Sequence, residues 1–431
     1  MTANTNNIKS STLISYQKAL EIINSVADKH TNNKKEKIKL LDAINRFQAD
    51  PILAPINVPS FDNSAMDGFA IKSEVVNKAI KQKGSIKLKV TGSIQAGDQA
   101  EIDINIDELA WEIMTGAPVP IGFDAVIQIE NVVISSDEDC KYITISENVK
   151  KDRNIRKLGT DYKLNQSVTE KHTIIQAQHI MALATVGIKD IEVIPQIKVA
   201  ILSTGNELAK KSSNSLNSGK IFNSNQPYLK SISKNLNCDP VFVGRCKDNI
   251  EDFNKLIDEA LSENSKLIFS TGAVSMGKYD FIPQALINRG AKIHFHKAKI
   301  RPGKPILFAE LDDGTIYFGL PGNPIAAAAG MRFFVSPFIR TLLGLPEDKP
   351  TKARLLNDIN KNLGFRTFAK AHAKINELGQ VCVDMLLDQG SYQSRSFAQS
   401  NCWIILPENK SFIKTGELID IAPMVPNKMI F

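Results

Sequence analysis

The sequence lacks several features that would assign it to a particular class of protein. It has no apolar run near the about 20 residues of a membrane-spanning helix, and its 5 cysteines are scattered, without any C-x-x-C pair. The N-terminus, MTANTNNIKSSTLISYQKAL, lacks the basic start and apolar core of a secretion signal, and the net charge of +7 forms no arginine-rich run. These absences predict a cytoplasmic protein without a disulfide framework, a cysteine zinc site, a membrane anchor or a nucleic-acid partner.

The remaining composition is that of a folded, multidomain protein. Hydrophobic residues make up 43% and charged residues 23% of the 431 residues, and at about 150 residues per domain the length suits about three domains. Helical spacing up to about Arg46, short apolar runs between turns up to about residue 150, and a helix at 175–186 indicate a β-rich N-terminal half over 1–195. We predict an α/β domain over 196–345 and a small all-β domain over 350–431.

The part after Pro195 alternates strands and helices, which predicts a doubly wound α/β sheet. Two of its apolar runs, ILSTG and IFSTG, end in Ser-Thr-Gly, and a third, FGL, leads into Pro-Gly-Asn-Pro. In such a sheet the three strand ends lie at one edge, where ligands bind. The sequence therefore predicts a crevice lined by Gly205, Gly272 and the 321–324 loop.

The stretch FGLPGNPIAAAAG, residues 318–330, predicts a strand, a tight loop and the start of a helix. Asn323 is a good helix cap and Pro324 suits the first helical position, so the next N–H groups are expected to face an anion. The loop lacks the Gly-Lys-Ser/Thr of a nucleotide P-loop. Any cations for that anion must come from elsewhere in the chain.

Charged residues near the predicted crevice supply candidates for its chemistry. Glu207 and Asp280 follow the two Ser-Thr-Gly turns and are suited to hold Mg²⁺ against phosphate oxygens. For Asp280, capping of the following helix is an equally good interpretation. Lys297, Arg301 and Lys304 surround the rigid RPGKP turn, which predicts a cradle for a polyanion, the alternative being a solvated hairpin end.

Other residues have a simple structural interpretation when taken alone. Asp67 precedes Gly68 in SAMDGFAI, as in a hairpin turn, and Thr115 follows a strand in a proline-braced turn. His294 and His296 alternate onto one strand face, but no third ligand lies nearby in the sequence. We interpret this histidine pair as packing or surface residues.

Taken together, the motifs resemble the molybdopterin molybdenumtransferases, the MoeA family, which is related to the C-terminal region of gephyrin. The resemblance is carried in order by VPSFDNSAMDGFA, IMTGAPVP, NIRKLGTD, VAILSTGNEL, GKIFNSN, STGAVSMGKYDF, RPGKP and GLPGNP. The C-terminal DQGSYQSRSFAQSNCWIILP is similar to the last domain of the family. The match extends over nearly the whole chain from about Leu13.

The resemblance implies a fold, an assembly and a reaction. The N-terminal half would contain two structural domains that take part in dimerisation, followed by the molybdopterin-binding α/β domain and a C-terminal β-barrel. The enzyme would be a homodimer that inserts molybdate into adenylylated molybdopterin and releases AMP, with Mg²⁺ or a similar divalent ion. The adenylyltransferase of the same pathway is a possible partner.

The resemblance also assigns roles to individual positions. Positions tied to activity are Asp67, Thr115, Glu207, Asp248, Asp280, Lys297 and Arg301, with Glu207 and Asp280 as metal ligands. Substrate-binding positions are Gly205, Gly272, Ser275, Lys304, Pro305, Pro321, Asn323, Pro324, Arg156, Asp161, Lys370 and Ser391. Ser275, Lys304 and Pro305 match a molybdate or phosphate pocket, and Lys370 and Ser391 would contribute to it from the C-terminal domain.

Some positions depart from the family pattern, and two other functions stay open. Asn206 and Asn223 stand where acids are frequent, Ala326 replaces a serine, and Arg301 stands where a lysine also occurs. The first alternative function is the adenylyltransferase, which would not need the SAMDGFA half or the β tail. The second is a gephyrin-like binding scaffold, for which peptide binding would survive loss of the acidic residues.

Overall fold

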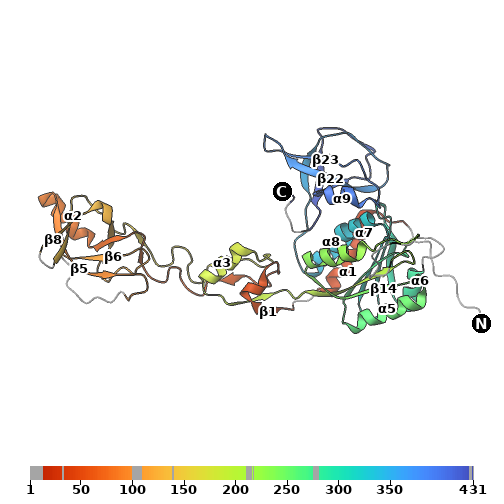
Figure 1. The fold of residues 1–431 in the computed structure, drawn as a ribbon, viewed down its shortest axis with the longest axis horizontal. Helices are drawn as coiled ribbons and strands as arrows, with labels where there is room; N and C mark the ends of the chain where they lie inside the picture. Colours follow the sequence, from red (N-terminus) through yellow and green to blue (C-terminus); the bar gives the residue numbers. More distant parts are fainter. Residues whose placement is uncertain are drawn as a thin grey trace, which may run out of the picture. The chain divides into compact units, whose positions relative to one another are not determined.

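The computed structural model describes residues 13–31, 34–99, 109–137, 140–209, 216, 218–274, 281–426 and 430. These residues form two compact units. One unit combines the chain up to Glu36 with Ile194–Phe431, and the other is Lys37–Val193. Because the placement of the two units relative to each other is not determined, each is described by itself (Figure 1).

A six-stranded α/β sheet forms the centre of the first unit. Its order is β14-β13-β15-β19-β18-β16. The first four strands run parallel, β18 is antiparallel to β19, and β16 is antiparallel to β18, so that among these six strands β18 alone runs in the opposite direction. The bounds are β13 (Ile197–Thr204), β14 (Cys238–Cys246), β15 (Leu267–Thr271), β16 (Lys292–Lys297), β18 (Pro305–Glu310) and β19 (Ile316–Leu320). This order confirms the prediction that the two Ser-Thr-Gly strands and the FGL strand are neighbours.

Helices cover both faces of this sheet. They must, because successive side chains of the buried strand β13 point to opposite faces and are apolar on both. Val199 and Ile201 pack in the hydrophobic cluster on one face of the sheet, whereas Ala200 and Leu202 pack in the cluster on the other face. The first side carries α1 (Tyr16–His30), α4 (Asn225–Asn235), α7 (Pro324–Gly330) and α8 (Ser336–Leu342). The second carries α5 (Ile250–Ser262) and α6 (Ile282–Asn288), which Figure 1 shows across the sheet from α1, α7 and α8.

Helices α7 and α8 are joined by a π-helical segment, η3 (Met331–Val335), into one continuous rod. Within the described residues, this rod, Pro324–Leu342, is the one helix long and apolar enough to cross a membrane, and 78% of its most apolar window is buried inside the unit. Such burial is expected of a core helix, since the helix packs its apolar side chains against the sheet and against α1.

Helix α1 is shorter than the predicted helical segment. Its spacing places Ala19, Ile23 and Val26 on one buried face, as the sequence predicts. However, the helix ends at His30, and residues 36–39 form a strand instead. The extension to Arg46 was wrong because the apolar spacing is lost after Ala27. The helix packs against α8 in the first unit.

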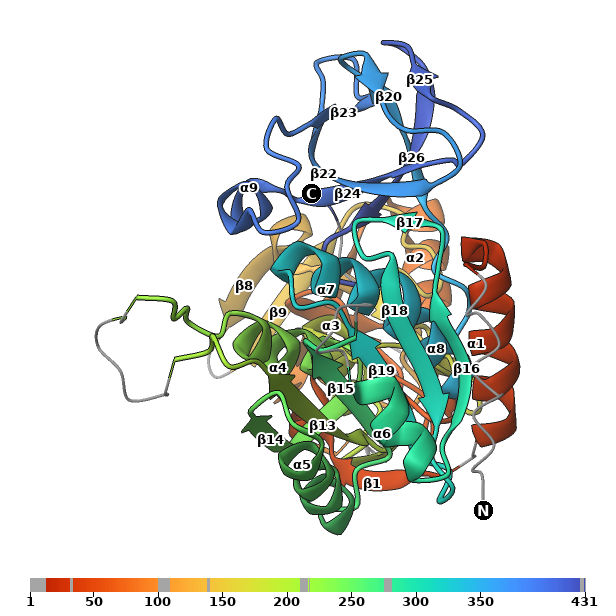
Figure 2. The same ribbon diagram turned by 90° about the vertical axis from the view of Figure 1, so that its right-hand side faces the viewer.

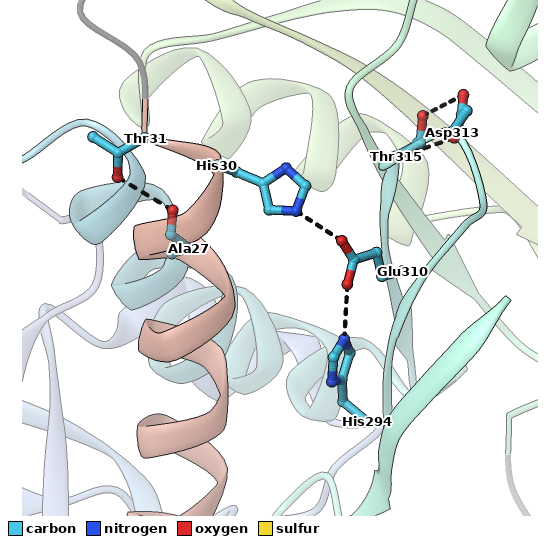
Figure 3. A network of polar contacts seen from close by, with 7 residues as sticks. All are labelled: Ala27, His30, Thr31, His294, Glu310, Asp313 and Thr315. Atoms are coloured by element: carbon cyan, nitrogen blue, oxygen red, sulfur yellow. Dashed lines mark hydrogen bonds and ion pairs between the residues drawn. The ribbon is translucent and has the colours of Figure 1, made fainter.

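The C-terminal end of α1 is attached to the sheet through a carboxylate between two histidines (Figure 3). His30 Nε2 lies 2.9 Å from Glu310 Oε1, and His294 Nε2 lies 3.3 Å from Glu310 Oε2. His294 also stacks on Phe308, with ring centroids 5.2 Å apart. The packing role predicted for His294 is therefore confirmed.

This arrangement predicts acid sensitivity of the first unit. Burial lowers the pKa of His294, only partly offset by Glu310, so a proton binds more readily to the unfolded chain and stability falls with pH below about 6.5. His294→Gln, which keeps a hydrogen-bond donor without a titrating ring, is expected to flatten the decrease in melting temperature between about pH 8 and 5. His372→Gln on an exposed strand position is the control, and equal slopes for the wild type and His294→Gln would contradict this prediction.

The C-terminal domain of the same unit is a closed β-barrel. The strands follow the order β22-β23-β20-β26-β24, and β24 pairs again with β22. Figure 2 shows this barrel beside the α7 end of the α/β sheet. The strands are β20 (Thr351–Leu355), β22 (Arg366–Ile375), β23 (Val381–Met385), β24 (Cys402–Leu406) and β26 (Leu418–Pro423), with α9 (Ser394–Gln399) and the short pair β21 (Ile359–Asn360) and β25 (Phe412–Ile413). The predicted β-barrel is confirmed.

The second unit, Lys37–Val193, contains a six-stranded sheet of order β7-β4-β6-β5-β9-β8. The bounds are β4 (Gly68–Ile71), β5 (Ile86–Ile94), β6 (Leu109–Ile113), β7 (Ala125–Gln128), β8 (Val133–Asp137) and β9 (Cys140–Ile145), with α2 (Ser73–Lys83) packed on β5. A smaller cluster surrounds α3 (Ala177–Thr185) and contains η1 (Leu40–Ala43) and two two-stranded pairs, β1 (Glu36–Lys39) with β12 (Asp190–Val193) and β2 (Ile52–Leu53) with β11 (Ser167–Thr169). A third pair, β3 (Asn63–Ser64) with β10 (Ile155–Arg156), packs Ile155 against the six-stranded sheet.

Candidate functional site

A pocket of about 340 Å³ opens at the carboxyl ends of β13, β15 and β19. Both Ser-Thr-Gly turns and the Pro-Gly-Asn-Pro loop contribute to it, as predicted from the three strand ends. The pocket is lined by Thr204, Gly205, Glu207, Asp248, Gly272, Ala273, Val274, Pro305, Pro321, Gly322 and Asn323. Most of the lining is backbone and small side chains, which suits a ligand that is bound by N–H groups and charge.

Two glycines bring the backbone close together at the base of the pocket. Gly272 has φ +95°, and a Cβ on it would lie 2.4 Å from the backbone oxygen of Thr204 on the neighbouring strand. A Cβ on Gly205 would lie 2.6 Å from both carboxylate oxygens of Glu207. The Glu207 carboxylate therefore folds back over Gly205 and stands exposed at the pocket. Among the described residues it has no hydrogen-bond or ion-pair partner.

Asp248 lies on the other side of the first turn and has a structural partner. Its Oδ2 accepts from the backbone N–H of Asn206 at 3.0 Å, while the backbone N–H of Asp248 donates to Asn206 Oδ1 at 3.4 Å. Lys220 Nζ donates to the Asn206 carbonyl at 2.5 Å. These bonds hold the first Ser-Thr-Gly turn against the end of β14. Asp248 shapes the pocket, and Asn206 serves as the polar link where the family pattern has acids.

The Pro-Gly-Asn-Pro loop differs from the prediction at its helix start. Asn323 occupies the cap position before Pro324, but its side chain makes no capping bond and instead donates from Nδ2 to Ser391 Oγ at 3.1 Å. The next N–H, of Ile325, donates to the Ser391 carbonyl at 2.9 Å. The expected free N–H at this position was therefore wrong, because the C-terminal domain already supplies its acceptor.

The basic hairpin reaches the pocket through its last residue. Within the described chain, Pro305 lines the pocket and Lys297, Arg301 and Lys304 do not. Lys297 lies opposite Pro305 in the β16–β18 register, and Lys304 is exposed. Arg301, in β17 (Ile300–Arg301), lies 4.8 Å above the Phe365 ring of the C-terminal domain. The predicted cradle of three cations is therefore not part of the pocket lining.

Gly303, in the same hairpin, approaches the first turn of α7. A Cβ on Gly303, whose φ is +100°, would lie 3.3 Å from the Ala326 carbonyl oxygen. Ala326 is 3% exposed. The position where the family pattern has a serine is thus buried beneath the hairpin.

His296 connects the edge of the sheet to the second Ser-Thr-Gly turn. Its Nε2 lies 2.7 Å from the carbonyl oxygen of Val274, a residue that lines the pocket. Because a carbonyl only accepts, this ring nitrogen carries the hydrogen. The interpretation of His296 as a structural residue agrees with this bond. Val274 directly precedes residues 275–280, which lie outside the described residues and include two predicted site residues, Ser275 and Asp280.

Asp67 and Thr115 form a polar pair in the second unit. The backbone N–H and the Oγ1 of Thr115 both donate to Asp67 Oδ1, at 2.7 and 2.8 Å. These two hydrogen bonds hold the pKa of Asp67 below its usual range. Asp67 is therefore an ordered, exposed carboxylate, which sequence alone presented as a simple hairpin turn.

Removing the Thr115 hydroxyl is expected to raise the pKa of Asp67 toward its ordinary value of about 3.9, because one of the two donors is lost. Thr115→Val tests this with almost no change in volume, and Thr115→Ser, which keeps the hydroxyl, is the matched control. The measurement is an NMR titration of the Asp67 carboxyl carbon. Identical titration of Thr115→Val and wild type would show that the hydroxyl does not contribute.

Arg156 and Asp161 are the other predicted site positions in the second unit. Arg156 and Asp161 are both exposed, and these two described side chains make no ion pair with each other. Their neighbour Lys157 instead pairs with Asp62 at 2.8 Å and Asp152 at 2.6 Å. Lys157, next to Arg156, thus belongs to a surface ion-pair network. Sequence reasoning missed this network, because Asp62 is far from Lys157 in the chain.

Sequence reasoning also missed Asn225 at the start of α4. It is 9% exposed, and its Nδ2 donates to the Gly322 carbonyl at 2.7 Å. This bond attaches the glycine of the Pro-Gly-Asn-Pro loop to a neighbouring helix. The only sequence signal was the asparagine-rich stretch FNSN, which is equally typical of a helix cap, the role that Asn223 performs by accepting from the N–H of Gln226.

Comparison with known sequences places the whole chain in one group of proteins. Residues 14–187 match the MoeA N-terminal region (domain I and II), residues 200–341 a probable molybdopterin binding domain, and residues 352–424 the MoeA C-terminal region (domain IV). A molybdopterin molybdenumtransferase of Haemophilus influenzae is 35% identical over 391 residues, covering 90% of this chain and 93% of the relative. The chain belongs to the MoeA family.

Two further relatives of the MoeA family support the same assignment. A molybdopterin molybdenumtransferase of Synechococcus elongatus is 32% identical over 397 residues, covering 90% of this chain and 94% of that protein. The crystal structure of a molybdopterin biosynthesis MoeA protein from Pyrococcus horikosii has a TM-score of 0.81 and 26% identity, covering 96% of this chain and 99% of that one. This chain therefore shares the fold of that MoeA protein over nearly its whole length, including the C-terminal barrel.

Proposed function

We propose that this MoeA-family chain is an enzyme of molybdenum cofactor biosynthesis that inserts molybdenum from molybdate into adenylylated molybdopterin and releases AMP. The relatives that match it nearly end to end are molybdopterin molybdenumtransferases. The observation that carries the proposal is the pocket in which both Ser-Thr-Gly turns and the Pro-Gly-Asn-Pro loop meet, with Glu207 at its rim. Reactions at phosphate groups are catalysed mainly by backbone N–H groups and charges that are already in position, and the protein itself forms few covalent bonds.

Glu207 is the residue that we propose as the first ligand of a divalent cation. Its carboxylate stands at the pocket without a partner among the described residues, and Mg²⁺ typically takes one or two carboxylates together with substrate phosphate oxygens. Within the described chain no group of three or more His, Cys, Asp and Glu side chains gathers as a protein-only metal site. When bound, such a cation neutralises phosphate charge. Asp280 is the second ligand proposed.

The remaining roles belong to the charge around the pocket. Lys297, Arg301 and Lys304 attract the anionic substrates, and Pro305 connects this hairpin to the pocket wall.

We further propose that the enzyme is a cytoplasmic homodimer in which Asp67 of one copy completes the pocket of the other. The exposed Asp67 carboxylate, ordered by Thr115, supports this role. Mixing Asp67→Asn with Glu207→Gln protein tests it, since mixed dimers would regain one intact site.

The proposal predicts a specific reaction in vitro. Purified protein incubated with adenylylated molybdopterin, molybdate and Mg²⁺ is expected to release AMP and to yield molybdenum-loaded cofactor. If the protein instead produced adenylylated molybdopterin from ATP and molybdopterin, it would be the adenylyltransferase. Peptide binding without either reaction would identify a scaffold. The chain contains the second unit, which carries Asp67, and the β-barrel. The adenylyltransferase needs neither of them, so their presence favours the insertion reaction.

A further inference from the structure

Lys370 is the most completely buried charged side chain among the described residues. It lies on β22 of the barrel with 0% exposure. Its Nζ donates to the carbonyl oxygens of Gly390 and Gln393, both at 3.2 Å, and to Ser396 Oγ at 2.7 Å. An ammonium has three donors, so these three acceptors occupy all of them.

The acceptors of Lys370 lie on one segment, residues 388–396, which has no regular structure before α9 begins at Ser394. The Gln389 side chain holds the same segment to the backbone of Lys370, accepting from its N–H at 2.9 Å and donating to its carbonyl at 2.8 Å. Ser396 Oγ adds a bond to the Asp388 carbonyl at 2.7 Å. Lys370 is therefore the point around which the segment is folded.

The opposite side of this segment forms part of the support of the pocket. Ser391 accepts from Asn323 Nδ2 through its hydroxyl and from the Ile325 N–H through its carbonyl. Asn323 lines the pocket, whereas Ser391 is not among the lining residues. A continuous path of hydrogen-bonded residues thus leads from the buried ammonium through residues 390–393 to the pocket wall.

We propose that Lys370 is a positioning residue for the transferase reaction: its ammonium shapes residues 388–396 so that Ser391 fixes the Asn323 wall of the pocket. This inference rests on the proposed function and replaces the sequence-based assignment of Lys370 as a substrate ligand. Burial lowers the pKa of Lys370, and the three acceptors compensate for the loss of water around the charge. The β-barrel therefore participates in the site through its shape and without a direct contact from this lysine.

Lys370→Met tests the inference, because it keeps the length of the side chain and removes all three donors. In the protein without substrates, hydrogen exchange of the Ile325 amide and of residues 388–396 is expected to increase about 10- to 100-fold, the effect of losing hydrogen bonds to a charged group. The rate of AMP release is expected to decrease by a similar factor, because the wall is misplaced. Lys374→Met, at an exposed position of the same strand, is the control.

The two readouts separate the possible outcomes. A higher KM for molybdate with unchanged exchange in the free protein would overturn the inference and restore Lys370 as a ligand. If Lys370→Met does not fold, Ser396→Ala removes one acceptor and is expected to raise exchange of the Ile325 amide by a smaller factor, and no rise would overturn the inference. If the wild type inserts no molybdenum, the proposed function fails, while the exchange measurements still decide the role of Lys370.

Discussion

Glu207→Gln is expected to decrease molybdenum insertion by about 100- to 1,000-fold, the usual cost of removing one prearranged charged or polar group from a reaction site. The substitution keeps the size of the side chain and removes its negative charge. Because the Glu207 carboxylate is exposed and has no partner among the described residues, the fold does not depend on it. The measurement is single-turnover AMP release from adenylylated molybdopterin with saturating molybdate.

Two comparisons make the Glu207 result specific. Glu251→Gln, in the exposed first turn of α5, removes one negative charge from the same domain and is expected to leave the rate unchanged. Raising the Mg²⁺ concentration is expected to restore part of the activity of Glu207→Gln, because a neutral amide oxygen is a weaker ligand for Mg²⁺ than a carboxylate oxygen. A Glu207→Gln protein with the rate of the wild type would remove Glu207 from the proposed mechanism.

Much of the pocket was predictable because its parts follow directly from strands. A continuous apolar run that ends in Ser-Thr-Gly identifies both a buried parallel strand and the glycine turn after it, and parallel neighbours place their ends together. Gly205, Gly272 and residues 321–323 therefore lie where the sequence predicts them. For the C-terminal domain the local patterns predicted strands alone, and the family resemblance implied that they form a barrel, because its closure depends on the pairing of β24 with β22.

The support around the pocket was not predictable, because it consists of contacts between side chains and distant backbone. Neither the bond of Asn323 to Ser391 nor that of Asn225 to Gly322 has a spacing that could reveal it. Asn323 in particular has the sequence context of a helix cap, but its side chain bonds to Ser391, which is distant in the chain, instead of capping the helix. Helix α1 illustrates the same limit, since its apolar stripe predicts a buried face but not the helix α8 that covers it.

The base of the pocket depends on a position that accepts only glycine. Gly272→Ala is expected to destabilise the first unit by about 2–4 kcal/mol, combining a positive φ with overpacking of a buried site. The added Cβ would lie 2.4 Å from the Thr204 carbonyl and 2.7 Å from Thr204 Oγ1, so β13 and β15 must separate where their turns line the pocket. Backbone cannot move aside as a flexible side chain can. The measurement is chemical denaturation together with AMP release.

Gly364→Ala is the matched control for Gly272→Ala, because Gly364 has a similar positive φ of +84° in the same unit and no atom within 4 Å of the added Cβ. Its expected cost is therefore the backbone strain alone, about 1 kcal/mol, with activity retained. The difference between the two variants isolates the contact of Gly272 with Thr204. Equal destabilisation would mean that the strands adjust without cost, whereas a larger loss in Gly272→Ala, accompanied by loss of AMP release, ties the packing of the two Ser-Thr-Gly turns to the reaction.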